Sequence, residues 1–306
     1  MATALTRRVV ASVAALALLA GGCGTGNGDD ASPGDVGGGL STSTQPGETP
    51  TGARPGTTVR GGSGPAASTR SGGSGNTGTT PTRNDSELRA AASGPPGGFA
   101  SALLAPGPAD ELVIDVLVQD GAAVDTAVIA QLRQVLAAAS SKPVDVRGPV
   151  AFTSSDSVHS ADDLRRLADE QGKPEQGNGA AVVHVLYLDG GFSDDGVLGV
   201  TVRGDVIGVF PDQIASAATP LVSRARIERA VVTHELGHVM GLVDLYLDEG
   251  RDDTDHPGHS TNPRSVMYWA VESDLVAQIL GGPPPVDFDA DDQADLRKIH
   301  GGARPG

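Results

Sequence analysis

The composition of the first third of the chain is the feature that most limits its fold. Residues 24 to about 108 consist mainly of Gly, Ser, Thr and Pro and contain almost no large apolar or aromatic side chains. Such a segment cannot bury enough apolar surface to offset the entropy lost on ordering. We therefore expect a disordered linker over residues 23–108 and a single folded domain over residues 109–306.

The first 22 residues have the pattern of an export signal. Two arginines precede an apolar run over residues 9–20, which is too short to span a bilayer and is typical of a signal-peptide core. Small residues stand directly before the only cysteine, Cys23, and this arrangement resembles a bacterial lipobox. The resemblance implies cleavage after residue 22 and lipid attachment to Cys23, hence an exported protein on the outer face of the bacterial membrane. An ordinary secreted protein is the alternative.

The rest of the chain alternates between strand-like and helix-like patterns. Residues 126–140 and a segment that starts at Ser160 have helical spacing, and Asp289 is placed to cap a C-terminal helix. His184 lies in a nearly continuous apolar run, so we expect it to be a core histidine. Together these patterns predict an α/β domain with a twisted mixed sheet. We expect its strands at residues 111–119, 144–153, 180–188, 197–202 and 206–210.

Two histidines stand four residues apart in a segment with helical periodicity. His234 and His238 lie on one face of that helix, close enough for both imidazoles to bind a single zinc ion, and Glu235 lies beside them. Thr219 and Pro220 are expected to begin the helix. The sequence therefore predicts a zinc site on the buried side of a long helix.

Two further residues extend this pattern. Gly241 follows His238 by three residues and can end the helix in a left-handed turn, and Met267 lies in a short apolar segment after a polar loop. With them the sequence resembles the metzincin clan of zinc endopeptidases, whose signature is His-Glu-x-x-His-x-x-Gly-x-x-His/Asp followed by a methionine-containing turn. The resemblance implies one catalytic zinc ion, peptide hydrolysis by a zinc-activated water, Glu235 as the general base and Met267 beneath the ligands. It also implies an outer antiparallel strand that pairs with the substrate, for which residues 196–210 are the candidate.

The third metal ligand has more than one candidate. The contiguous signature points to Asp244, as in the snapalysin-like variant with aspartate. The matrixin spacing, in which the methionine comes eight residues after the histidine, points to His259. We prefer His259, with Asp244 then orienting a ligand, and His256 is a third candidate.

Two other functions remain open from the sequence. A gluzincin-type peptidase would use a downstream glutamate such as Glu272 as its third ligand, but that scheme gives Gly241 and Met267 no role. A surface-anchored binding module could instead hold a structural zinc ion without catalysis. The acidic segment at residues 248–255 offers oxygens of the kind that bind calcium, and a solvated loop is the alternative.

The net charge of the chain limits the classes of molecule that the domain is expected to bind. The net charge is −16 at pH 7, and most acidic residues lie after residue 108. We therefore do not expect the domain to bind nucleic acids or anionic surfaces. We expect a monomer whose partners are a peptide or protein substrate and, through the anchor, a lipid bilayer.

Overall fold

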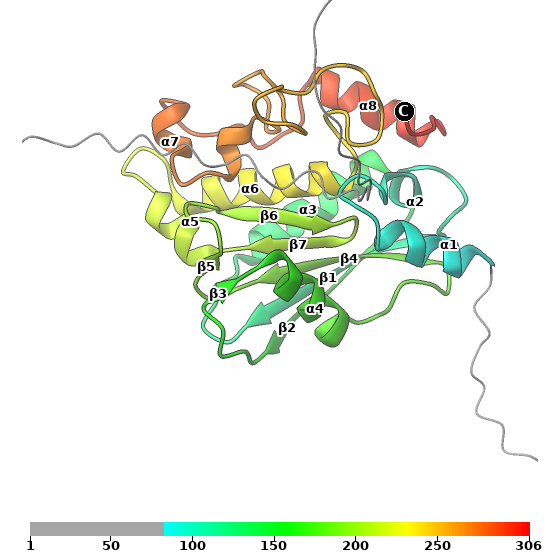
Figure 1. Ribbon diagram of the computed structural model, residues 1–306, viewed down its shortest axis with the longest axis horizontal. Helices are drawn as coiled ribbons and strands as arrows, with labels where there is room; N and C mark the ends of the chain where they lie inside the picture. Colours follow the sequence, from blue (N-terminus) through cyan, green and yellow to red (C-terminus); the bar gives the residue numbers. More distant parts are fainter. Residues whose placement is uncertain (1–82) are drawn as a thin grey trace, which may run out of the picture. The chain divides into compact units, whose positions relative to one another are not determined.

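A five-stranded sheet forms the centre of the part of the chain that the computed structural model describes, residues 83–306 (Figure 1). Its order is β2-β1-β4-β7-β6, and β6 at one edge is the antiparallel strand among otherwise parallel neighbours. The fold is thus the mixed α/β fold predicted from the sequence. The strands are β1 (Glu111–Gln119), β2 (Val144–Phe152), β4 (Ala180–Tyr187), β6 (Gly199–Arg203) and β7 (Val206–Val209).

Helices cover both faces of the sheet. All residues of β4 are buried, and neighbouring residues enter different apolar clusters because successive side chains of a strand point to opposite faces. Val185 packs in the cluster that contains α3 (Thr126–Ala139) and α6 (Arg224–Val239), whereas Leu186 packs in the cluster of α4 (Ala161–Gln171). In Figure 1, α3 and α6 lie behind the sheet and α4 lies in front of it.

The folded part begins well before residue 109, so the predicted linker is wrong for residues 83–108. This segment forms α1 (Arg83–Ala92) and α2 (Ala100–Leu104), and Phe99 and Leu103 are fully buried in the main core. The backbone also closes one end of β6, because the N–H of Gly204 donates to the carbonyl of Gly94 at 2.9 Å. The low apolar content of residues 24–108 as a whole concealed the few apolar residues near its end that fill the core. The signal segment, Cys23 and the linker up to residue 82 lie outside the described residues.

The helix that carries the histidine pair begins later than predicted. Ser223 is its N-cap, and the side chain of Ser223 accepts a hydrogen bond from the N–H of Arg226. Thr219 instead closes a tight turn, in which its side chain accepts from the N–H groups of Leu221 and Val222. Ser223, four residues further on, therefore takes the capping role that the sequence predicted for Thr219, and Leu221 is exposed.

The remaining elements complete the domain. Asp289 caps the C-terminal helix in a capping box with Asp292, as predicted. No helix between residues 83 and 306 has both the length and the apolar character needed to cross a membrane. These elements are β3 (Val158–His159) and β5 (Gly191–Phe192), which pair with each other, the helices α5 (Pro211–Ala217), α7 (Val276–Ile279) and α8 (Ala290–His300), and the 3-10 helix η1 (Trp269–Glu272).

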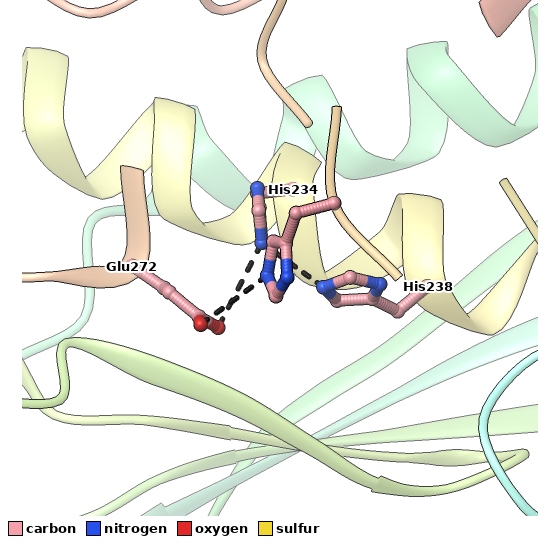
Figure 2. A group of neighbouring side chains, drawn as sticks. His234, His238 and Glu272 are labelled. Atoms are coloured by element: carbon pink, nitrogen blue, oxygen red, sulfur yellow. Dashed lines mark hydrogen bonds and ion pairs between the residues drawn. The ribbon is translucent and has the colours of Figure 1, made fainter. Parts of the chain in front are cut away.

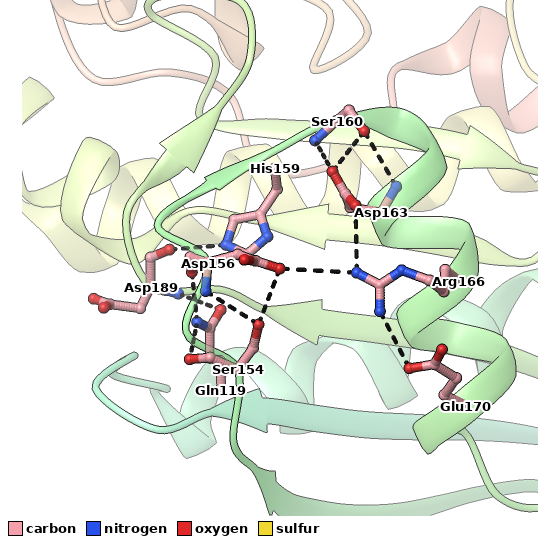
Figure 3. A network of polar contacts seen from close by, with 9 residues as sticks. All are labelled: Gln119, Ser154, Asp156, His159, Ser160, Asp163, Arg166, Glu170 and Asp189. Carbon is pink, nitrogen blue, oxygen red and sulfur yellow. Dashed lines mark hydrogen bonds and ion pairs between the residues drawn. The ribbon is translucent and has the colours of Figure 1, made fainter.

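A polar network fastens the loops at the carboxyl ends of β1 and β2 (Figure 3). The Gln119 amide donates to the carbonyl groups of Ser154 at 3.2 Å and Asp156 at 2.8 Å. Arg166 on α4 lies 3.8 Å from the Asp156 carboxylate. The network thereby ties the end of β1 to the connection that leads into α4.

Candidate metal centre

The C-terminal half of α6 presents two buried histidines. His234 is fully buried and His238 nearly so. The helix ends at Val239, and Gly241 then adopts a φ of 78°, where an added Cβ would press against Tyr246 and Ala100. Glycine is needed here because side chains rarely tolerate that conformation and no space is left for one.

The loop that follows returns His259 to the same place. The His259 ring centroid lies 5.1 Å from that of His234 and 4.9 Å from that of His238. A fourth donor, the Glu272 carboxylate, comes from the end of η1. Figure 2 shows the side chains of His234, His238 and Glu272 pointing toward one another.

The spacing of these four donors fits a tetrahedral metal ion. The Nε2 atoms of His234 and His238 are 3.0 Å apart, and the Glu272 oxygens lie 3.3 Å from His259 Nε2 and 3.7 Å from His234 Nε2. Ligand atoms at about 2.0–2.1 Å from a tetrahedral zinc ion are separated by about 3.3 Å. Histidine nitrogen and carboxylate oxygen are also donors that zinc prefers.

Hydrogen bonds on the outer ring nitrogens make the inner ones available. His234 Nδ1 lies 2.7 Å from the carbonyl of Val266 and His259 Nδ1 lies 3.3 Å from the carbonyl of His256. Because a carbonyl only accepts, each Nδ1 carries the proton and each Nε2 keeps a lone pair. His259 Nε2 is buried and has no hydrogen-bond partner among the described residues, although it lies within ion-pair distance of Glu272. A buried, unsatisfied lone pair that faces two others is what a metal ion would satisfy.

Burial keeps the two helix histidines neutral. It lowers the pKa of His234 to about 4, despite the opposing charge of Glu272, and lowers the pKa of His238 well below its usual value. For His259, burial pulls the pKa down, but the Glu272 carboxylate and two backbone carbonyls together raise it. Burial likewise favours a higher pKa for Glu272, yet His259 and the other histidines lower it. The two neutral imidazoles of α6 beside the ionised Glu272 carboxylate form a donor set ready for a cation.

Glu235 lies beside the cluster but is not one of its donors. Its side chain is fully buried, and Oε2 accepts a hydrogen bond of 2.8 Å from the hydroxyl of Thr201 on β6. Oε1 has no hydrogen-bond partner among the described residues. Burial, followed by the nearby charge of Glu272, raises the pKa of Glu235 well above its usual value. The edge strand is close to α6 here, since a Cβ on Gly199 would contact Val231 and Glu235.

The turn that contains Met267 packs against α6 at Gly237, a residue that was not among the site residues predicted from the sequence. Met267 is fully buried, and a Cβ added to Gly237 would overlap its sulfur. Ser265 donates from its hydroxyl to the carboxylate of Asp292 on α8 at 3.1 Å and accepts the N–H of Met267 at 3.0 Å. The C-terminal helix thereby holds the turn beneath the donors. The glycine inside the His-Glu-x-x-His pattern was the available signal for this contact.

The structure places the other two third-ligand candidates away from the cluster. The Asp244 carboxylate accepts N–H groups of three residues of the following loop, among them Glu249 at 2.9 Å and Asp252 at 3.1 Å. The His256 ring stacks on Trp269 at a centroid distance of 4.3 Å. Asp244 therefore shapes the loop that delivers His259.

Nothing among the described residues supports a calcium site in the acidic loop. Among residues 83–306, the only group of three or more converging histidine, cysteine or carboxylate donors is the one with His234, His238, His259 and Glu272. Asp252 instead lines a cavity of about 300 Å³ together with Asn262 and Asp289. The expectation of calcium thus has no support, and the solvated acidic loop is the better description.

No protein-family model matches this chain, and no match is found among curated proteins. Among solved structures it is similar to archaemetzincin from Archaeoglobus fulgidus in complex with malonate, at 17% identity over 60% of this chain and 99% of that one, with a TM-score of 0.35. It is also similar to archaemetzincin from Methanopyrus kandleri, at 16% identity over 62% and 96% of the two chains, with a TM-score of 0.37.

A third similar structure is a zinc-dependent peptidase from Methanocorpusculum labreanum, at 17% identity over 60% of this chain and 99% of that one, with a TM-score of 0.36. Because these identities and TM-scores are low, the function proposed below depends on the residues of the metal centre.

Proposed function

We propose that this protein is a zinc-dependent endopeptidase that cleaves extracellular or cell-envelope proteins. The observation that carries the proposal is Glu235: a fully buried carboxyl with one oxygen held by Thr201 and the other unpartnered, beside three converging imidazoles. A structural metal site needs no such group, and an unsatisfied buried oxygen is costly. General-base catalysis gives that oxygen a role.

In the proposed mechanism, His234, His238 and His259 would hold a zinc ion. When bound, zinc supplies a Lewis acid that polarises the carbonyl of the cleaved bond and lowers the pKa of water toward about 7. Glu235 Oε1 accepts a proton from the attacking water and delivers it to the nitrogen of the departing amine. Thr201 fixes the carboxyl group by its hydrogen bond to Oε2.

The peptide is proposed to pair with the edge strand β6. This strand is antiparallel to its neighbour β7 and lies at the edge of the sheet. Gly199 and Thr201, both on β6, approach Glu235. An extended peptide added to this edge would therefore run past the general base, with main-chain hydrogen bonds holding it in register.

Replacement of Glu235 by glutamine tests this function. We expect Glu235→Gln to retain zinc while cleavage of a peptide library falls by about 10²- to 10⁴-fold, which is the usual contribution of general acid-base catalysis. Glu175→Gln makes the same chemical change at an exposed position and should leave cleavage intact. A Glu235→Gln protein as active as the wild type would reject the mechanism.

One observation favours a second function, a binding module with a structural zinc site. Glu272 completes a set of four donors, and closed four-donor zinc sites are typically structural. In that case the wild-type protein would bind zinc and cleave no member of the peptide library. The Glu235→Gln substitution would then change neither property.

The place of action is proposed from the N-terminal sequence. The basic start, the short apolar run and the single cysteine favour an exported lipoprotein anchored through Cys23 on the outer face of the bacterial membrane. We expect Cys23→Ser to move the protein from the membrane fraction to the culture medium. A variant that stays in the membrane fraction would argue against the lipid anchor.

A further inference from the structure

Glu272 stands where a fourth metal ligand belongs. Its two carboxylate oxygens lie 3.3 Å from His259 Nε2 and 3.7 Å from His234 Nε2. Donor atoms of all three histidines and of Glu272 lie within 4.8 Å of one another. A zinc ion held by three imidazoles at about 2.0–2.1 Å would therefore be within reach of this carboxylate.

The backbone around Glu272 is fixed to the segment that leads into the edge strand. The carbonyl of Glu272 accepts the N–H of Leu198 at 2.8 Å, and the N–H of Asp274 donates to the carbonyl of Gly196 at 2.8 Å. Ser273 forms an antiparallel bridge with Val197 between these two bonds. Because both ends of this stretch are anchored, the Glu272 side chain can move by rotation about its own bonds while the backbone stays in place.

Solvent reaches the Glu272 carboxylate but does not reach the His234 imidazole. The Glu272 side chain is 17% exposed, whereas His234 is completely buried. The carboxylate is therefore more accessible than His234 to a small molecule or a peptide carbonyl. Four occupied positions also leave no place for the water that the proposed mechanism requires, because catalytic zinc sites keep one position open.

We propose that Glu272 is the fourth metal ligand of the resting protein and that it must leave the metal before a peptide is cleaved. The inference rests on the proposed function, since it concerns the same metal ion. Glu272 holds the metal tightly between catalytic events and competes with any ligand that needs the fourth position. Displacement is a rotation of the Glu272 side chain.

Cobalt loading of the full chain tests the proposal. Cobalt(II) reports its coordination by its visible absorption spectrum, and acetohydroxamate serves as a probe for the fourth position. We expect Glu272→Gln to change the cobalt spectrum, to weaken zinc binding by about tenfold or more, and to bind acetohydroxamate about tenfold more tightly, because the probe no longer displaces a carboxylate. At peptide concentrations below KM, cleavage by this variant should rise.

Asp274→Asn is the matched control. It removes an acidic charge two residues away and outside the cluster, so the cobalt spectrum and acetohydroxamate binding should remain those of the wild type. If Glu272→Gln leaves the spectrum, the zinc affinity and acetohydroxamate binding unchanged, Glu272 is not a ligand and the proposal fails while the peptidase function stands. If the wild-type chain binds neither cobalt nor zinc, the peptidase function fails as well.

Discussion

Two histidines of this protein, the buried His184 and the half-buried His259, differ in what surrounds their ring nitrogens. His184 on β4 is buried, and its Nδ1 lies 2.9 Å from the carboxylate of Asp115, which also accepts the N–H of Lys173. His259 is held through Nδ1 as well, but its Nε2 is buried without a hydrogen-bond partner and faces two other imidazoles. Burial alone therefore does not identify a metal-binding histidine; convergent, unsatisfied lone pairs do.

Removal of His259 should have the largest effect. Loss of a residue that only supports a metal ligand costs about 10- to 100-fold in affinity, so His259→Ala should weaken zinc binding by more than about 100-fold. A competition titration with a chromophoric chelator measures this. His256→Ala is the control and should keep zinc, and Asp244→Asn tests the rival ligand. Loss of zinc in Asp244→Asn but not in His259→Ala would mean that the third ligand is Asp244.

The Asp115–His184 pair should affect stability without affecting the metal. Asp115→Ala leaves a buried imidazole nitrogen and the N–H of Lys173 without their partner, which should lower the free energy of unfolding by about 1–3 kcal/mol. Urea unfolding at a fixed zinc concentration measures it. Asp145→Ala on the neighbouring strand removes an exposed carboxylate and should cost little. Loss of zinc from the folded Asp115→Ala protein would show that the two histidine environments are coupled.

The contact between Gly237 and Met267 tests how much apolar packing next to the metal-centre histidines contributes to stability. An alanine at position 237 overlaps the Met267 sulfur, and such overpacking costs about 1–3 kcal/mol, partly offset by about 1 kcal/mol of better helix propensity. Gly237→Ala should therefore unfold at lower urea concentration than the wild type. Gly282→Ala, which meets no atom within 4 Å, is the control. Unchanged stability in both variants would mean that the methionine turn adapts freely.

The hydroxyl of Thr201 should have the smallest effect. Thr201→Val removes the donor to Glu235 Oε2 but preserves the shape of the side chain. We expect a loss of about 1 kcal/mol, seen as a roughly fivefold fall in kcat with unchanged zinc content. Thr201→Ser keeps the hydroxyl and should remain close to the wild type. Equal losses in both variants would indicate that packing, rather than the hydrogen bond, matters here.

Several features that depend on residues close together in the sequence were predicted correctly. The four-residue interval between His234 and His238 fixes their common helix face, and the strands around the central sheet were predicted within a few residues. Placing His259 ahead of Asp244 depended on its distance from Met267. The structure indeed brings His259 to the helix histidines, while the Asp244 carboxylate binds loop N–H groups.

Contacts between distant segments could not be read from the sequence in the same way. Thr201 meets Glu235 across 34 residues. Glu272, which the sequence offered only as the third ligand of a gluzincin-type site, joins three histidines from a 3-10 helix that no periodicity marks. The start of α6 was misplaced because Thr219 and Ser223 are both good capping residues, and tertiary packing decides between them.

The two N-terminal helices also determine where a recombinant fragment can begin. Phe99 and Leu103 fill the core, and the carbonyl of Gly94 accepts the N–H of Gly204, the residue directly after β6. A protein cut at Ala109 would therefore expose an apolar surface, which promotes aggregation. A soluble fragment for crystallisation or assay should start no later than Arg83.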